Sequence, residues 1–144
     1  MIERKRGRIV SVCSTTAFTP IPSTTVYSGT KWGLRGFMNC LNAELLLNNQ
    51  DKFIKTTTVF PEFMNTRKEL TDVLDKINFK LSRLNPERVA DETVKGMLNN
   101  EQEVLICDVK IGVYITSYLS SSGIKHLLKS SAKLDKIFDS KQSK

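Results

Sequence analysis

The 144-residue sequence lacks several features that would point to particular protein classes. Its three cysteines, Cys13, Cys40 and Cys107, are odd in number, widely spaced and without a C-x-x-C motif, so neither a disulfide framework nor a zinc site is indicated. The single histidine, His126, stands among lysines and has no metal-ligand motif around it. We expect no metal site, and a reducing compartment is the simplest interpretation.

Long hydrophobic runs are also absent. No apolar stretch approaches the roughly 20 residues needed to cross a bilayer, and the opening "MIERKRGRIV" lacks the apolar core of a signal peptide. The sequence alone therefore predicts a soluble chain, with neither a signal peptide nor a transmembrane segment.

Acidic residues are fewer than basic ones, and the net charge is +7. Such a charge favours anionic partners such as nucleic acid or acidic lipid. The basic cluster "RKRGR", residues 4–8, has no aromatic residues interleaved with it, and no sequence motif of a nucleic-acid-binding domain follows it. Nucleic-acid binding is therefore not favoured. With 40% apolar and 26% charged residues, the composition is that of one folded domain.

Strand-like and helical segments alternate along the chain. The β-branched runs at 7–14, 53–61 and 103–107 predict strands, the first of them buried. Between them, residues 26–47 and 85–100 predict helices, the second with Asn85 as its cap and Pro86 at its first position. Helices between strands are typical of parallel β-α-β units, so the predicted class is α/β.

The helix at 26–47 has an apolar stripe that is expected to face the core, and Cys13 and Cys40 are interpreted as small buried hydrophobes. Residues 112–144 predict a basic helical tail, with lysines beside apolar residues. The stripe of the first helix contains Leu34, Phe37, Met38, Leu41 and Leu45, and that of the tail contains Ile124, Leu127, Leu128, Leu134, Ile137 and Phe138.

A candidate site follows from the rule that parallel sheets bind ligands beyond the carboxyl ends of their strands. Ser14 follows the first strand, and Tyr27 and Lys31 are four residues apart near the start of the next helix, so they share one face. A neighbouring cation stabilises a phenolate and makes a tyrosine a usable proton donor and acceptor. A serine hydroxyl facing the phenol could hold a carbonyl oxygen between them. These residues indicate a carbonyl reductase.

The segment "SVCSTTAFTPIPSTTVYSGTK", with Ser14 thirteen residues before Tyr27, resembles the catalytic segment of the short-chain dehydrogenases/reductases. "VFPEFMNT" is similar to the segment that follows the next strand in that family. The amino-acid sequences of these segments and of residues 85–107 are similar to those of the retinol dehydrogenase and 17-beta-hydroxysteroid dehydrogenase branch of the family. The resemblance implies the carboxyl-terminal strands of a Rossmann fold.

The resemblance also implies a role for each matching residue. Tyr27 would be the general acid and base, Lys31 would favour its phenolate and bind the nicotinamide ribose, and Ser14 would orient the substrate oxygen. Further residues would border the nicotinamide of NAD or NADP, although a phenylalanine is more often core and a threonine more often a helix cap. These are Pro61, Phe63 and Thr66.

The glycine-rich phosphate loop of that family has no counterpart, because no G-x-G-x-x-G occurs in the sequence. We therefore expect residues 1–111 to form the carboxyl-terminal half of such a Rossmann domain, followed by the tail at 112–144. The predicted function is interconversion of a lipid alcohol, retinoid or steroid, and its ketone or aldehyde. As a fragment, the isolated chain is expected to bind cofactor poorly or not at all and to be inactive.

An alternative function is a catalytically inactive remnant that acts as a membrane-surface or protein-interaction module. The basic tail suits an acidic membrane surface. The resemblance implies an endoplasmic-reticulum membrane or a lipid droplet as the location, and homodimers formed through the long helix that begins near Tyr27. Substrate, direction of reaction and the choice between NAD and NADP stay open.

Overall fold

The computed structural model describes residues 1–19, 21, 24–64, 66 and 83–108. Within these residues, three parallel strands form one sheet in the order β1-β2-β3. The strands are β1 at Gly7–Val12, β2 at Ile54–Pro61 and β3 at Glu103–Ile106. This sheet confirms the predicted α/β class, and all three strands lie where the sequence predicted them.

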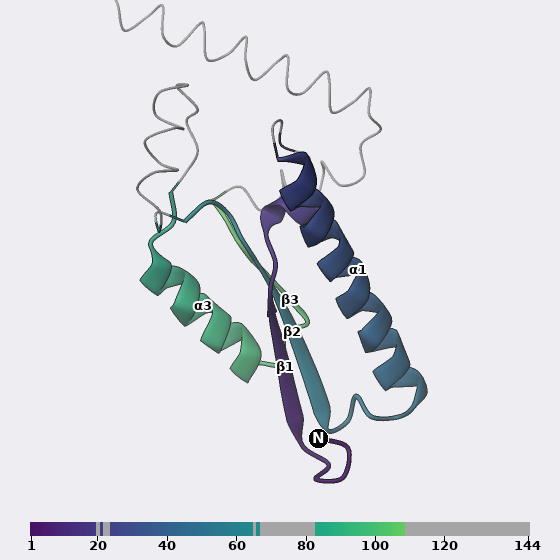
Figure 1. Cartoon of the computed structure of the whole chain (residues 1–144). Helices are drawn as coiled ribbons and strands as arrows, with labels where there is room; N and C mark the ends of the chain where they lie inside the picture. Colours follow the sequence, from purple (N-terminus) through teal and green to yellow (C-terminus); the bar gives the residue numbers. More distant parts are fainter. Residues whose placement is uncertain (20, 22–23, 65, 67–82, 109–144) are drawn as a thin grey trace, which may run out of the picture.

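Two helices lie on opposite sides of this sheet, α1 at Thr25–Leu47 and α3 at Pro86–Leu98 (Figure 1). A short 3-10 turn, η1 at Thr15–Ala17, follows β1 and precedes α1. The predicted tail at 112–144, with His126, and most of the chain between Thr66 and Leu84 lie outside the described residues.

The core is divided by the sheet into two clusters. On the α1 side, Phe18 and Phe60 pack edge to face, with ring centroids 4.7 Å apart at 69°, an arrangement worth about 0.5–1.5 kcal/mol beyond the area that it buries. The cluster on this side contains Cys13, Ala17, Phe18, Phe60, Leu105 and Cys107, and the one on the α3 side contains Val59, Leu84, Val89, Val104 and Ile106.

Strand β1 corrects one prediction, because it is not buried as expected. Its residues alternate between half-buried and exposed, and Val10 and Val12 are exposed. Among the described residues β1 forms one of the two edges of the sheet, and the α3-side cluster contains side chains of β2 and β3 but none of β1. By contrast, β2 lies between two strands, and seven of its eight residues are buried.

Helix α1 buries part of the predicted stripe, and it corrects two predictions of burial, one for Phe37 in the stripe and one for Cys40 outside it. Met38 and Leu45 are buried, as predicted, and they have the helical spacing that keeps them on the sheet side. Phe37 is 64% exposed and Cys40 is also exposed, so the predictions that they are buried are wrong. Phe37 is one residue before Met38 and Cys40 is two residues after it. Because successive residues of an α-helix are turned by about 100° around its axis, neither lies on the face that buries Met38.

The start of helix α3 is set by the capping residues that the sequence analysis identified. The side chain of Asn85 accepts a hydrogen bond from the backbone N–H of Glu87 at 3.0 Å, and Pro86 occupies the first helical position. The predicted cap is thus confirmed. Asn100 follows the helix with a φ of 59°, a left-handed conformation that asparagine tolerates better than most residues. Asn49 does the same after α1, with a φ of 55°.

Candidate active site

Ser14 lies directly beyond the carboxyl end of β1 and caps η1. Its backbone is extended, with a φ of −169°, and its Oγ accepts a hydrogen bond from the backbone N–H of Thr16 at 3.2 Å. Because this bond uses an acceptor position of the hydroxyl, the Ser14 O–H remains available as a donor. Ser14 is buried, with 7% of its surface exposed.

Tyr27 and Lys31 lie one turn apart in the first half of α1. The Lys31 Nζ is 5.6 Å from the centroid of the Tyr27 ring, within the range of a cation–π contact. The same ammonium donates a hydrogen bond to the carbonyl oxygen of Val12 at 3.1 Å. Tyr27 is half exposed, at 49%, so the phenol is accessible while its neighbouring cation is held in place.

A second bond fastens the backbone of Lys31 to the same strand end. The Cys13 thiol donates to the carbonyl oxygen of Lys31 at 3.3 Å, and burial raises the pKa of this thiol, which keeps it protonated as a donor. Lys31 is thus bonded to the two residues that precede Ser14. Among the described contacts, none joins Ser14 directly to Tyr27; Lys31 contacts the Tyr27 ring and is bonded to the two residues that precede Ser14.

The other predicted residues lie at or beyond the carboxyl end of β2, at the same end of the sheet as Ser14: Pro61 is the last residue of the strand, and Phe63 and Thr66 follow it. Pro61 is buried and pairs with Ile106 of β3. Phe63 is half-buried, and its carbonyl oxygen accepts from the backbone N–H of Leu84 at 2.9 Å. Thr66 is exposed. No described contact links these three residues to Tyr27 or Lys31, so their assignment stays a prediction.

Glu62, which the sequence analysis did not single out, is the titratable residue at the end of β2. Its Oε2 atom is buried without a hydrogen-bond partner among the described residues. Burial raises the pKa of this carboxyl above its ordinary value of 4.5; the backbone N–H of Asp108 lowers it and the charge of Asp108 raises it. The available signal was an acid inside the otherwise apolar run "VFPEFM".

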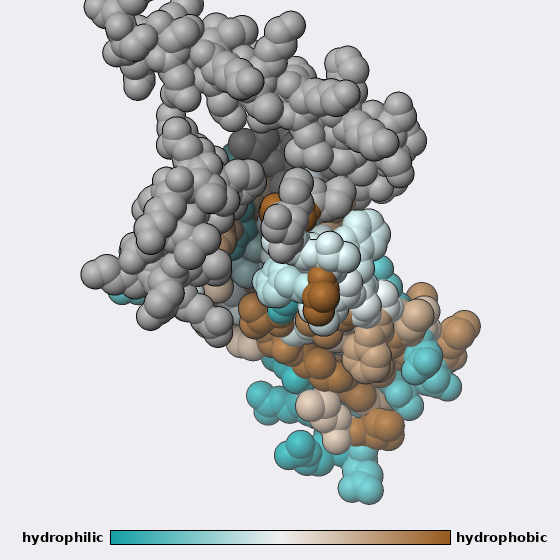
Figure 2. Space-filling view, turned by 45° about the horizontal axis from the view of Figure 1, so that its top comes forward, coloured by the Kyte–Doolittle hydropathy of each residue, from teal (hydrophilic) through white to brown (hydrophobic). Residues whose placement is uncertain are grey.

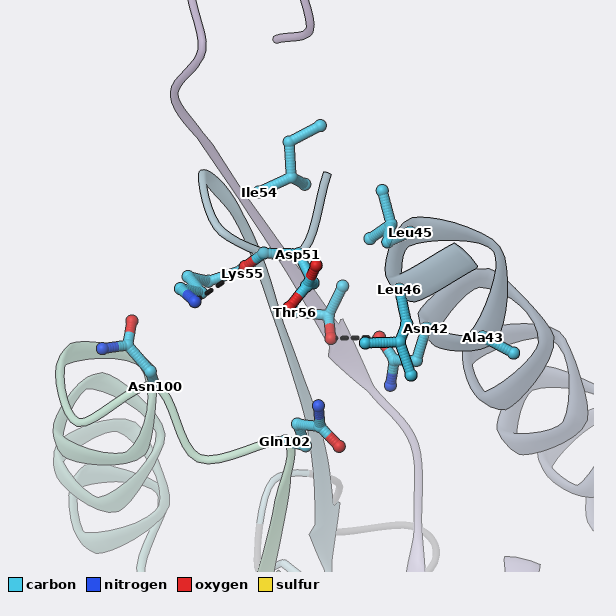
Figure 3. A pocket seen from close by; sticks show the side chains of 10 residues that line it. All are labelled: Asn42, Ala43, Leu45, Leu46, Asp51, Ile54, Lys55, Thr56, Asn100 and Gln102. Carbon is cyan, nitrogen blue, oxygen red and sulfur yellow. Dashed lines mark hydrogen bonds between the residues drawn. The ribbon is translucent and has the colours of Figure 1, made fainter. Parts of the chain in front are cut away.

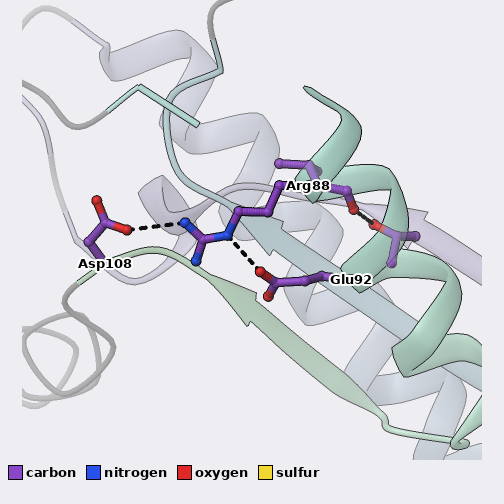
Figure 4. A network of polar contacts seen from close by, with 5 residues as sticks. Arg88, Glu92 and Asp108 are labelled. Atoms are coloured by element: carbon purple, nitrogen blue, oxygen red, sulfur yellow. Dashed lines mark hydrogen bonds and ion pairs between the residues drawn. The ribbon is translucent and has the colours of Figure 1, made fainter. Parts of the chain in front are cut away.

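Asp108, which follows β3, connects the carboxyl end of the sheet to α3. Arg88 donates to Asp108 at 3.3 Å and to Glu92, one turn along the helix, at 2.8 Å (Figure 4). All three side chains are substantially exposed, so the network is a surface feature. Within the described part of the chain, no group of three His, Cys, Asp or Glu residues could hold a metal ion.

A cavity of about 250 Å³ lies at the opposite end of the sheet, where β2 begins and α1 ends (Figure 3). Thr56 donates a hydrogen bond to Asn42 across it, and Lys55 donates to the backbone carbonyl of Asp51 at 2.7 Å. Because parallel sheets bind ligands at their carboxyl ends, we do not assign this cavity to the reaction. Its lining is Asn42, Ala43, Leu45, Leu46, Asp51, Ile54, Lys55, Thr56, Asn100 and Gln102.

The model of the family described as short chain dehydrogenase matches residues 1–75, about half of the chain. This chain belongs to the short chain dehydrogenase family. The matched range contains all six predicted site residues and the segment that carried the resemblance, so the family prediction is confirmed. It does not test the role of any single residue.

Curated members of the short chain dehydrogenase family match beyond that range. Dehydrogenase/reductase SDR family member 7B of Mus musculus is 30% identical over 126 residues, covering 80% of this chain and 37% of the relative. Family member 7C of Mus musculus is 29% identical, with coverages of 82% and 40%. The hydroxysteroid 11-beta-dehydrogenase 1-like protein of Xenopus tropicalis is 33% identical, with coverages of 53% and 26%. The chain spans two fifths or less of the length of these relatives.

Solved structures confirm the fold. A short chain dehydrogenase from Burkholderia cenocepacia in complex with NADP superposes with a TM-score of 0.66 at 16% identity, covering 88% of this chain and 49% of that one. Actinorhodin polyketide ketoreductase with NADPH gives a TM-score of 0.60 at 22% identity, with coverages of 76% and 49%. The three strands and their helices are therefore part of a Rossmann fold, as predicted.

Proposed function

We propose that this chain forms the proton-transfer part of an NAD(P)-dependent oxidoreductase that interconverts a lipid alcohol and its ketone or aldehyde. The observation that carries the proposal is the position of Lys31, whose ammonium lies between the Tyr27 ring and the strand end that leads into Ser14. Membership of the short chain dehydrogenase family supports the reaction class.

Tyr27 is the general acid and base in this proposal. In the reducing direction its phenol O–H gives a proton to the carbonyl oxygen of the substrate, and in the oxidising direction the phenolate removes the proton from the alcohol. The Lys31 ammonium stabilises the phenolate that forms. Ser14 donates its free O–H to the same substrate oxygen and so orients it.

The residues present fit the nicotinamide end of a dinucleotide. Lys31 offers an ammonium and Tyr27 a phenol at the carboxyl end of the sheet, and both can hydrogen-bond ribose hydroxyls, while Pro61, Phe63 and Thr66 would border the ring. The dinucleotide supplies the hydride chemistry when it is bound. We assign no residue of this chain to the pyrophosphate, because it contains no G-x-G-x-x-G.

The substrate class is a retinoid or a steroid in this proposal. The sequence resembles the retinol and 17-beta-hydroxysteroid dehydrogenase branch, and the relative from Xenopus tropicalis is named for a hydroxysteroid dehydrogenase. We propose an endoplasmic-reticulum membrane or lipid droplet as the location, which suits a lipid substrate. No helix among the described residues has both the length and the hydrophobicity to cross a membrane.

The test uses a chimera in which this chain replaces the aligned segment of mouse family member 7B. We expect NADH- or NADPH-dependent reduction of retinal or of a steroid ketone. Tyr27→Phe should lower kcat/KM by about 10²–10⁴-fold, the usual contribution of general acid–base catalysis. A folded chimera that binds NADPH but reduces none of these compounds would contradict the proposal, as would a Tyr27→Phe variant of undiminished activity.

A second candidate function is that of a catalytically inactive membrane-surface or protein-interaction module, including a homodimer. The specific observation is the set of exposed apolar side chains on α1, among them Val26, Phe37 and Leu47, and Figure 2 shows apolar side chains at the surface of the described part. Together with the net charge of +7, they would suit an acidic bilayer.

Vesicles that contain phosphatidylserine test the membrane-binding part of this candidate, and the absence of activity in the chimera separates it from the first proposal. Co-sedimentation of the 144-residue chain with them, lost on deletion of residues 120–144, would support membrane binding by the predicted tail. Co-sedimentation that survives the deletion would remove the tail from that account. Sedimentation mass would show whether the chain dimerises.

A further inference from the structure

Arg35 lies on α1 one turn beyond Lys31, and its side chain contacts three other elements of the fold. The guanidinium carbon is 3.8 Å from the centroid of the Phe18 ring and 6.0 Å from that of Phe60 on β2. Its Nη1 donates to the carbonyl oxygen of Ala17 at 3.4 Å, and its Nε lies 3.7 Å from Glu103 Oε1 on β3.

These contacts need a guanidinium and not merely a positive charge. A guanidinium is planar, so it can stack on an aromatic face and donate hydrogen bonds at its edge at the same time, whereas an ammonium is a strongly hydrated point charge. The Arg35 side chain is only 24% exposed, and Phe18 and Phe60 are buried. The Phe18 ring therefore covers much of the Arg35 cation, and Glu103 balances its charge.

The element that Arg35 holds in this way is the turn that contains Ser14. Ala17 ends η1, and Phe18 is its C-terminal cap, while Ser14 is the N-terminal cap of the same turn. Arg35 also follows Tyr27 and Lys31 at intervals of four residues, so all three leave one side of α1. One side chain thus fixes the turn of Ser14 against the helix of Tyr27.

We propose that Arg35 is a positioning residue, which sets the Ser14 hydroxyl relative to the Tyr27 phenol. The role rests on the proposed function, since it concerns the geometry of the same proton transfer. It fills a gap in the described contacts: Lys31 bonds Val12 and Cys13, ahead of Ser14, and Arg35 bonds the residues that follow it. Ser14 is thus held from both sides.

The test compares Arg35→Lys with the matched control Arg8→Lys in the chimera. Arg8 is on β1 and donates to Met97 on the α3 side, so both variants lose a guanidinium contact but only one touches the turn. A displacement of about 1 Å can cost on the order of 10²-fold in rate. We expect Arg35→Lys to lower kcat about 10- to 100-fold with little change in KM, and Arg8→Lys to leave both unchanged.

A double-variant cycle separates positioning from general stability. If Arg35 acts through Ser14, then Arg35→Lys should lower kcat much less in the Ser14→Ala background than in the parent, because interacting residues are not additive. The same loss in both backgrounds would overturn the proposal. So would an unchanged kcat in Arg35→Lys at a temperature where both proteins are folded.

Hydrogen exchange provides a readout that does not depend on activity. In the 144-residue chain, the amides of Thr16, Ala17 and Phe18 are bonded within the Ser14 turn, and Arg35→Lys should speed their exchange while β2 and β3 are unaffected. Faster exchange in the turn, with an inactive parent enzyme, would refute the proposed function but keep the mechanical link. Unchanged exchange would refute the link itself.

Discussion

The helices α1 and α3 cover opposite faces of one sheet, but they are stabilised in different ways. Helix α3 follows local rules: a side-chain cap from Asn85, Pro86 at the first position, Glu87 in the first turn and Lys95 in the last. These residues satisfy the helix ends and complement the helix dipole. Both ends of α3 therefore carry stabilising residues that are visible in its own sequence.

Helix α1 has few of these features. Its cap residue, Thr24, makes no side-chain capping bond, and no acidic residue lies in its first turn. It also contains Gly29, Gly33 and Gly36, each costing roughly 0.5–1 kcal/mol relative to alanine. Its first half is instead held by tertiary contacts from Lys31 and Arg35. The first half of the helix that carries the candidate site therefore depends on contacts with the rest of the fold, whereas α3 packs on the sheet and also has capping and charge features of its own.

The strongest test of this difference concerns activity. Lys31→Met removes the ammonium beside Tyr27, and we expect kcat/KM of the chimera to fall by at least about 10²-fold, since the phenolate loses its counter-charge. The same substitution at Lys95 on α3 should change kcat/KM less than about twofold. Steady-state kinetics, measured below the unfolding temperatures of both variants, would compare the two values of kcat/KM. Equal losses of kcat/KM in the two variants would mean that the residues needed for activity are not confined to α1.

Next in size is a pair of glycine substitutions. A Cβ added at Gly96 on α3 would overlap the Val104 Cγ2 on β3, whereas one added at Gly36 on α1 meets no atom within 4 Å. We expect Gly96→Ala to destabilise the chain by about 1–3 kcal/mol through overpacking. Gly36→Ala should stabilise it by about 0.5–1 kcal/mol. Urea unfolding measures both changes, and a destabilising Gly36→Ala would indicate that something packs closely on that face of α1.

The helix caps should differ by a smaller amount. Asn85→Ala removes the bond to the Glu87 N–H and should cost about 1 kcal/mol, the usual value for a lost N-cap. Thr24→Ala should cost less than that, since Thr24 bonds Ile21 and Ser28 but no helix-end amide. Urea unfolding midpoints compare the two. Equal costs would show that Thr24 supports α1 as strongly as a true cap.

The predictable parts of the molecule are those whose signals are local. The cap at Asn85, the β-branched run of β2 and the spacing of Ser14, Tyr27 and Lys31 are each visible within a short window of sequence. The exposure of Val10 and Val12 was not predictable, because it depends on which element covers that face of β1. Cys40 was assigned to the core from its residue type, although its helical position turns it outward.

Arg35 shows the same limit at the candidate site. Its partners Phe18, Phe60 and Glu103 are up to 68 positions away in the chain, and nothing around Arg35 in the sequence distinguishes it from a solvated arginine. Only the register of β2 beside β3 and the turn after β1 bring these groups together. Contacts that converge on one side chain from three elements need the fold to be known.

The smallest expected effect is the pH dependence that Glu62 confers. Burial, and then the charge of Asp108, hold the pKa of this carboxyl above 4.5, against the amide of Asp108 that lowers it. The folded chain therefore binds the proton more tightly than the unfolded one, and Glu62 favours folding below pH 4.5, a contribution that is lost as the pH rises through the folded pKa. Glutamine does not titrate, so Glu62→Gln should lose less stability than the parent as the pH rises. The free energy of unfolding of this variant, relative to that of the parent, should therefore increase from pH 4 to 7.

Urea unfolding at several pH values measures this difference. Asp108→Asn should reduce the pH dependence without removing it, because burial and not the neighbouring charge is the larger cause. If Glu62→Gln leaves the slope of stability against pH unchanged, the carboxyl is solvated in the folded chain. The end of the sheet beyond β2 would then be more open to water than the buried Oε2 atom of Glu62 indicates.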